Sequence, residues 1–188
     1  MLKRWKRTVL IRCLPVESVK MKTYKVLFVC LGNICRSPMA EYVLRHQAQQ
    51  AGVGARIEVA SAGTSGWHNG ENMHPGTAAM LKQHGISPSG FTSSQVHPLD
   101  AEEYDVIVAM DDSNIEALKR VIRFDAEQIF KLTDLIPESG YQHVPDPWHT
   151  DDFDVFLAQN FYKFRIFGLR RTRGADNLRL LRVTVFGT

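Results

Sequence analysis

Residues 26–41 read VLFVCLGNICRSPMAE, and this stretch passes from an apolar run through a short loop into a helical pattern. The four apolar residues at 26–29 predict a buried strand. Downstream, apolar side chains at 40, 43, 44, 48 and 51 recur with the spacing of one helix face. Pro38 suits a first helical turn, where no backbone N–H is needed. We therefore predict a strand over 25–30 and a helix over 38–50.

The loop between these two elements has the features of an anion-binding site. Backbone N–H groups around such a loop point inward, and the helix start adds unpaired donors and the positive end of its dipole. Arg36 offers a planar fork that can bind two oxygens of a tetrahedral oxyanion. We expect phosphate to be bound by the whole loop, that is by Leu31, Gly32, Asn33, Ile34, Cys35, Arg36 and Ser37.

Cys30 ends the predicted strand and faces this loop. Only the thiolate is a good nucleophile, and the loop N–H groups, Arg36 and the hydroxyl of Ser37 should all favour it. We therefore expect Cys30 to be largely ionised at neutral pH. Phosphoryl transfer requires in-line attack and neutralisation of the phosphate oxygens. The loop can supply both without a metal or a cofactor.

Asp146 is the best candidate for the proton donor that a leaving alkoxide or phenoxide needs. It lies in VPDPW at 144–148, where the prolines on both sides restrict the backbone and could present the carboxyl at a fixed angle. A bound dianionic phosphate would favour the protonated form of Asp146. The alternative is a plain turn residue.

The rest of the chain alternates between strands and helices. We predict strands at 57–60, 105–110 and 129–132 and helices at 76–84, 113–122 and 153–167. Asp111 and Asp112 are expected to cap the helix that follows them. This order favours an α/β fold, with three layers and a four-stranded parallel sheet that helices flank on both faces. The Cys30 loop then lies at the carboxyl end of the first strand, where such sheets bind ligands.

Four motifs follow one another between residues 24 and 155: CLGNICRSPMAE at 30–41, SAGTS at 61–65, AMDDSN at 109–114 and DPW at 146–148. Together they resemble the low-molecular-weight protein tyrosine phosphatases. The resemblance implies hydrolysis of phosphotyrosine, an aryl phosphate monoester, through a cysteinyl-phosphate intermediate. It makes Cys30 the nucleophile, Arg36 the phosphate clamp, and Asp146 the acid and then the base for water.

The resemblance also implies supporting and substrate-contacting residues. A hydrogen-bond network that shapes the loop would contain Asn33, Ser37, Ser61 and His84. His84 precedes Gly85 and could instead cap the end of a helix. Cys35 resembles a neighbouring thiol that forms a reversible disulfide with Cys30 and protects it from over-oxidation. Many relatives carry two aromatic residues after the Asp-Pro pair, and we expect the substrate rim here to contain Trp67, Trp148 and His149.

Other functions remain open on the same residues. A thiol-dependent arsenate reductase would need further cysteines, and only Cys13 is left over. A phosphoarginine phosphatase goes with Thr at the position of Ile34, so Ile34 favours an aryl substrate. A non-catalytic phosphate-binding module would not need both Cys30 and Asp146. A metal cluster could form from His143, Asp146, His149, Asp151 and Asp152, although such loops are mostly solvated.

Charge divides the chain into an acidic middle and two basic ends. Residues 1–22 hold seven Lys and Arg against one Glu, and residues 156–188 hold seven against one Asp. We predict a basic, disordered extension at 1–22, a phosphatase domain at 23–167 and an atypical basic tail at 168–188. A basic-tailed nucleic-acid binder is the alternative from another class.

Composition bears on the cellular compartment of the protein and on its partners. Three cysteines without an extracellular cue favour a cytoplasmic setting, and no apolar run approaches the length of a membrane span. We expect phosphotyrosine proteins as substrates and inorganic phosphate as product and inhibitor. We expect neither a membrane nor a nucleic-acid partner, and a monomer or weak dimer.

Overall fold

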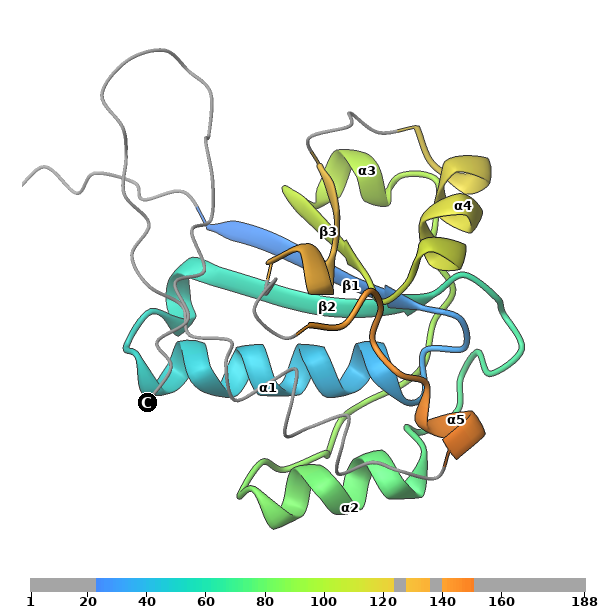
Figure 1. The fold of residues 1–188 in the computed structure, drawn as a ribbon. Helices are drawn as coiled ribbons and strands as arrows, with labels where there is room; N and C mark the ends of the chain where they lie inside the picture. Colours follow the sequence, from blue (N-terminus) through green and yellow to red (C-terminus); the bar gives the residue numbers. More distant parts are fainter. Residues whose placement is uncertain (1–22, 124–127, 136–139, 151–188) are drawn as a thin grey trace, which may run out of the picture.

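The computed structural model describes residues 23–123, 128–135 and 140–150. Its centre is a sheet of four strands in the order β2-β1-β3-β4, with every neighbouring pair parallel (Figure 1). The strands are β1 (Tyr24–Cys30), β2 (Ile57–Gly63), β3 (Val106–Ala109) and β4 (Ile129–Lys131). The predicted four-stranded parallel sheet is confirmed.

β1 is buried on both of its faces, as its continuous apolar run predicted. Alternate side chains of a strand point to opposite faces. Val26, Phe28 and Cys30 therefore join one apolar cluster, and Leu27 and Val29 join the other. Because β1 lies between β2 and β3, its carboxyl end is surrounded by backbone from both neighbours.

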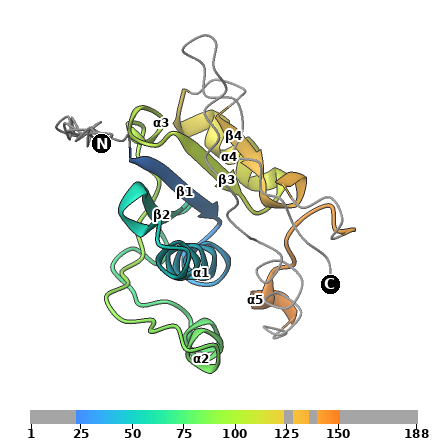
Figure 2. The same cartoon turned by 90° about the vertical axis from the view of Figure 1, so that its left-hand side faces the viewer.

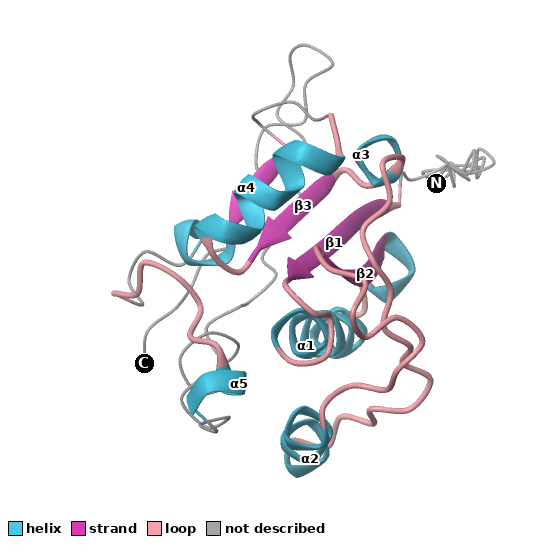
Figure 3. Ribbon diagram, turned by 90° about the vertical axis from the view of Figure 1, so that its right-hand side faces the viewer, coloured by secondary structure: helices cyan, strands magenta, loops and turns pink. Residues whose placement is uncertain are grey.

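Helices cover both faces of the sheet and give the predicted three layers. The helices are α1 (Arg36–Gln50), α2 (Pro75–Gln83), α3 (Asp100–Glu103), α4 (Asp112–Val121) and α5 (Pro147–Thr150), with 3₁₀ turns at Gly54–Arg56 and Leu132–Leu135. α1 and α2 lie on one side of the sheet, and α3 and α4 lie on the other (Figures 2 and 3). Buried Met39 of α1 and Leu118 of α4 belong to the two opposite clusters.

The element boundaries differ from the sequence prediction where the chain turns toward the loop at 30–36. β2 continues to Gly63, three residues past its predicted end, because residues 61–63 pair in register with residues 28–30 of β1. A β-carbon at Gly63 would lie only 2.9 Å from the carbonyl oxygen of Leu31. Glycine is therefore needed for this close approach. In the sequence, the same glycine had favoured a loop over a strand.

Three of the sequence predictions concern residues that the structure does not describe. The basic extension at 1–22, the tail at 168–188 and the helix at 153–167 lie outside the described residues. Among the residues that are described, no helix combines the length and the apolar composition that a membrane span needs.

The two-sided core yields a stability prediction. Leu81 of α2 is completely buried, whereas Leu99 is exposed. Leu81→Ala should lower the free energy of unfolding by about 2–5 kcal/mol, because it removes buried methyl groups and leaves a cavity. Leu99→Ala, the same chemical change at the surface, should alter it by no more than about 0.5 kcal/mol. Urea denaturation of both variants checks this, and equal losses would contradict the assignment of the core.

Candidate active site

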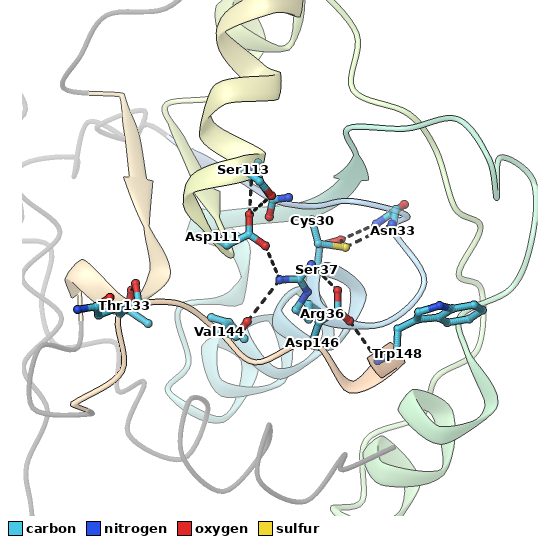
Figure 4. A network of polar contacts seen from close by, with 12 residues as sticks. Cys30, Asn33, Arg36, Ser37, Asp111, Ser113, Thr133, Val144, Asp146 and Trp148 are labelled. Atoms are coloured by element: carbon cyan, nitrogen blue, oxygen red, sulfur yellow. Dashed lines mark hydrogen bonds and ion pairs between the residues drawn. The ribbon is translucent and has the colours of Figure 1, made fainter. Parts of the chain in front are cut away.

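The end of β1 and the start of α1 enclose a loop of backbone around the Cys30 side chain (Figure 4). Cys30 is buried, with 3% of its surface exposed. Asn33 adopts a positive φ of 53°, a conformation that asparagine tolerates better than most residues. Its backbone N–H donates to Cys30 Sγ over 3.3 Å. The loop thus curls around the sulfur (Figure 4).

Ser37 supplies a second polar contact to the sulfur. Its Oγ lies 3.1 Å from Cys30 Sγ and accepts a hydrogen bond of 2.9 Å from Asn33 Nδ2. Because the Asn33 amide already donates to this oxygen, the hydroxyl hydrogen of Ser37 is free to point at the sulfur or at the Ala62 carbonyl, 3.3 Å away. Hydrogen bonds donated to a thiolate stabilise it relative to the thiol.

Asn33 joins the predicted supporting residues into one network. Its Nδ2 also donates to Ser61 Oγ over 2.8 Å, and its Oδ1 accepts from the backbone N–H of Ser94 over 2.9 Å. Both ends of the amide are therefore engaged, which fixes the direction in which the amide points. The structure brings together Asn33, Ser37 and Ser61, three of the four residues expected here.

Glu41 ends this network and was not anticipated from the sequence. Ser61 Oγ donates to Glu41 Oε2 over 2.6 Å, and Arg45 forms an ion pair with the same carboxylate. Burial raises the pKa of Glu41, and Ser61 and Arg45 oppose that rise. One signal was available: Glu41 lies next to Ala40 in a helical turn that is otherwise apolar, where an acidic side chain needs a partner.

His84 lies at the end of α2, with Nδ1 2.9 Å from the carbonyl oxygen of Met80. This contact corresponds to the helix-capping alternative that the sequence left open.

Arg36 is buried and is held by two carboxylates. Its Nη1 lies 2.6 Å from Asp111 Oδ2 and also donates to the Val144 carbonyl over 3.3 Å. Its Nη2 lies 2.6 Å from Asp146 Oδ2. Burial by itself would lower the pKa of Arg36, but the negative charges of Cys30, Asp146 and Asp111 raise it overall. The guanidinium therefore stays charged beside the loop.

Asp111 has a second role besides the predicted helix cap. As cap of α4, its Oδ1 accepts from the Asn114 N–H over 2.8 Å and from Ser113 Oγ over 2.6 Å. The other oxygen binds Arg36. Burial would raise the pKa of Asp111, but these hydrogen bonds and Arg36 lower it overall. Asp111 follows β3, so the meeting of parallel strand ends at one edge was the signal for this second role.

Asp146 reaches the loop from a segment far along the chain. Its Oδ1 accepts a hydrogen bond of 3.1 Å from the Trp148 N–H, while its Oδ2 contacts Arg36. The carboxyl is thus aimed at Arg36, as Figure 4 shows. The structure places Cys30, Arg36 and Asp146 at the same edge of the sheet.

Cys35 differs from Cys30 in its surroundings. Both thiols are free and buried. Burial raises the pKa of Cys35 to about 12, and the nearby negative charges of Cys30 and Asp146 add to this effect. Cys35 is therefore a neutral thiol at pH 7. Its neighbour in the loop, Ile34, is buried, whereas Leu31 is exposed.

The expected rim residues lie at the surface where they are described. Trp67 is 77% exposed and Trp148 is 56% exposed, while the side chain of His149 lies outside the description. Within the described ranges, no group of three or more His, Cys, Asp or Glu side chains could hold a metal ion. The alternative metal cluster includes Asp151 and Asp152, which are not among those residues.

The contact between Ser37 and the sulfur yields a testable prediction. Ser37→Ala removes a hydrogen-bond donor to the thiolate, and hydrogen bonds to charged groups contribute about 1.5–3 kcal/mol. Alkylation of Cys30 by iodoacetamide at neutral pH should therefore slow by roughly tenfold or more. Ser65→Ala removes a hydroxyl that donates to the Leu31 carbonyl instead, and should leave the rate unchanged. Equal rates in both variants would show that Ser37 does not activate the thiol.

The chain is similar to known proteins of one family. The family model for low molecular weight phosphotyrosine protein phosphatase matches residues 25–161. The chain is 44% identical over 130 residues to the low molecular weight protein-tyrosine-phosphatase YfkJ of Bacillus subtilis, covering 69% of this chain and 83% of that protein. It is 41% identical over 141 residues to a low molecular weight protein-tyrosine-phosphatase of Streptomyces coelicolor, covering 72% and 85%.

Solved structures show the same fold. The crystal structure of YfkJ from Bacillus subtilis matches with a TM-score of 0.69 and 39% identity, over 75% of this chain and 90% of that one. Vibrio vulnificus Wzb in complex with benzylphosphonate matches with a TM-score of 0.63 and 26% identity, over 74% and 92%. The family match, the sequence identities and the fold agree, and the chain belongs to the low molecular weight protein tyrosine phosphatase family.

Proposed function

We propose that this protein hydrolyses phosphotyrosine and other aryl phosphate monoesters with Cys30, Arg36 and Asp146 as its catalytic residues. One observation carries the proposal. A thiol that receives hydrogen bonds and an acidic side chain both lie beside one buried arginine, although Asp146 is remote from the other two in sequence. Nucleophile, oxyanion clamp and proton donor are the three groups that the reaction requires.

In the first step the Cys30 thiolate attacks phosphorus, and the bond from phosphorus to the phenolic oxygen breaks. Arg36 and the backbone N–H groups of the loop stabilise the negative charge on the remaining phosphate oxygens. Asp146 donates its proton to the departing phenoxide. A tyrosine phenol has a pKa of about 10, so a leaving group without this proton would be poor.

In the second step water attacks the phosphorus of the cysteinyl phosphate. Asp146, now a carboxylate, accepts a proton from that water. The sulfur–phosphorus bond breaks, inorganic phosphate leaves, and the thiolate of Cys30 is regenerated with Ser37 and Asn33 as hydrogen-bond donors. Every step uses side chains of this chain.

Substrate entry must rearrange the contacts of Arg36. Asp146 occupies Nη2, so an incoming phosphate oxygen displaces the carboxylate from that nitrogen. Asp111 can remain on Nη1 throughout, because it is fixed as the cap of α4. Asp111 thus orients the guanidinium, and Asp146 is released for proton transfer.

We also propose a substrate class, a cellular compartment and an oligomeric state for this protein. Vibrio vulnificus Wzb was solved with benzylphosphonate, an aromatic phosphonate, which supports an aryl phosphate here. We propose that residues 23–167 form the phosphatase domain and that the protein is cytoplasmic and a monomer or weak dimer. Its substrates would be phosphotyrosine proteins, and inorganic phosphate would inhibit it. Cys35 as a reversible disulfide partner of Cys30 belongs with these proposals.

Turnover of p-nitrophenyl phosphate tests the catalytic assignments. Cys30→Ser should abolish it, because the serine hydroxyl is not ionised at neutral pH. Asp146→Ala should lower kcat/KM by about 10²–10⁴-fold, the range for a lost general acid. The control Asp134→Ala changes an exposed carboxylate and should have no effect. Turnover that survives in Cys30→Ser, or that disappears with EDTA, would refute this mechanism.

The role of Asp111 can be separated from its role as a cap. Asparagine caps helices as well as aspartate does, so Asp111→Asn should preserve α4 while its amide loses the charged contact with Arg36. We expect kcat/KM to fall about 10–100-fold, matching the 1.5–3 kcal/mol of a hydrogen bond between charged groups. Asp112→Asn, its exposed neighbour, is the matched control. An unchanged kcat/KM in Asp111→Asn would mean that Arg36 needs no second carboxylate.

A further inference from the structure

Trp148 lies two residues after Asp146 and contacts two histidines from a distant part of the chain. The centroid of a Trp148 ring lies 6.0 Å from that of His68 and 5.8 Å from that of His74. These separations are within the range of favourable aromatic pairs, and the 77° angle to His74 is an edge-to-face arrangement. The segment that carries the acid therefore rests on the segment between β2 and α2.

Both histidines are fixed against the phosphate-binding loop. A β-carbon at Gly32 would lie 2.9 Å from His68 Cδ2, so this ring covers the loop backbone directly. His68 Nδ1 lies 2.9 Å from Glu71 Oε2, which orients the ring. The backbone N–H of His74 donates to the Ile34 carbonyl over 2.8 Å. The surface that receives Trp148 thus has a defined position relative to the loop.

The acid-bearing segment is also held on the other side of Asp146. The backbone N–H of Val144 donates to the Met110 carbonyl over 2.9 Å, just past the end of β3. The Val144 carbonyl accepts from Arg36. Asp146 therefore lies between a backbone attachment at Val144 and an aromatic attachment at Trp148, and the prolines on either side limit its torsions.

We propose that Trp148, whose side chain contacts His68 and His74, is a positioning residue that holds the Asp146 carboxyl in reach of the leaving group. This inference rests on the proposed function, in which Asp146 is the general acid. The backbone of Trp148 contributes as well, because its N–H binds Asp146 Oδ1 over 3.1 Å. The side chain thus acts on the reaction through the acid, apart from any contact that it makes with substrate.

Leaving groups of different basicity distinguish this role from substrate binding. A general acid matters most when the leaving group is strongly basic, and it must lie within hydrogen-bond reach of the oxygen that it protonates. Phenyl phosphate has such a leaving group, whereas 2,4-dinitrophenyl phosphate needs little protonation. Both substrates carry an aromatic ring, so the loss of a substrate-binding wall would affect both alike.

The experiment compares kcat/KM for these two substrates in matched variants. For Trp148→Ala, kcat/KM with phenyl phosphate should fall at least about tenfold, which is part of the roughly 10²–10⁴-fold that a general acid contributes. With 2,4-dinitrophenyl phosphate it should stay nearly constant. Trp148→Phe keeps an aromatic ring and should preserve most activity on both. His74 is the N-cap of α2, because its Nδ1 accepts from the Gly76 N–H over 3.2 Å. His74→Asn keeps an acceptor for this cap and removes one ring, so it should show a smaller loss confined to phenyl phosphate.

Asp146→Ala is the reference that separates the two proposals. It should lose far more activity on phenyl phosphate than on 2,4-dinitrophenyl phosphate, and equal losses would overturn the general-acid assignment itself. If Asp146→Ala discriminates while Trp148→Ala loses both activities equally, or neither, then the positioning role is overturned. A selective loss with rescue by Trp148→Phe supports the proposal. If Trp148→Ala does not fold, His74→Asn carries the test, and a loss in this variant that is equal for both substrates overturns the positioning role.

Discussion

The buried guanidinium of Arg36 is the charge around which the active-site edge is arranged. A buried arginine is strongly unfavourable unless it is paired and hydrogen-bonded. Here Asp111 and Asp146 meet this requirement at its two terminal nitrogens. They come from the turn after β3 and from the segment before α5, so one ion-pair system joins three parts of the chain that the sheet brings to the same edge. The ion pairs that stabilise the buried charge of Arg36 also place Asp146 beside the loop at 30–36.

The thiol of Cys30 is surrounded by hydrogen bonds whose directions are fixed, just as Arg36 is held by two ion pairs. Asn33 takes the left-handed conformation that aims its N–H at the sulfur, and its side-chain amide donates toward both Ser37 and Ser61. The carboxylate of Glu41 accepts from Ser61 and so fixes the polarity of the chain of contacts from its far end. A fully satisfied buried network of this kind is rigid, and it holds the loop at 30–36 in one conformation around the sulfur.

Secondary structure could be predicted from the sequence where it depends on a local pattern. The contacts of a side chain could not be predicted where it binds a second residue from a distant part of the chain. The strands and α1 follow from apolar runs and helical spacing, and their bounds were close to those observed. β2 was expected to end early because Ser61, Ala62 and Gly63 look like turn residues. Pairing with β1 and the close approach of Leu31 select small residues there. Asp111 was identified as a cap, but its contact with Arg36 depends on a pairing of strands that no local pattern contains.

Local sequence patterns were enough to predict a cysteine at the end of a strand, an arginine at a helix start, an aspartate between prolines, and an α/β order that puts the loop at a strand end. These features depend on neighbours in the chain, because dihedral preferences and periodicity are local. The further partners of these groups became visible in the folded chain. Glu41 accepts the hydrogen bond of Ser61, Asp111 shares Arg36 with Asp146, and Trp148 rests on His68 and His74. Such contacts join segments remote in sequence, and their geometry is set when parallel strands align at one edge.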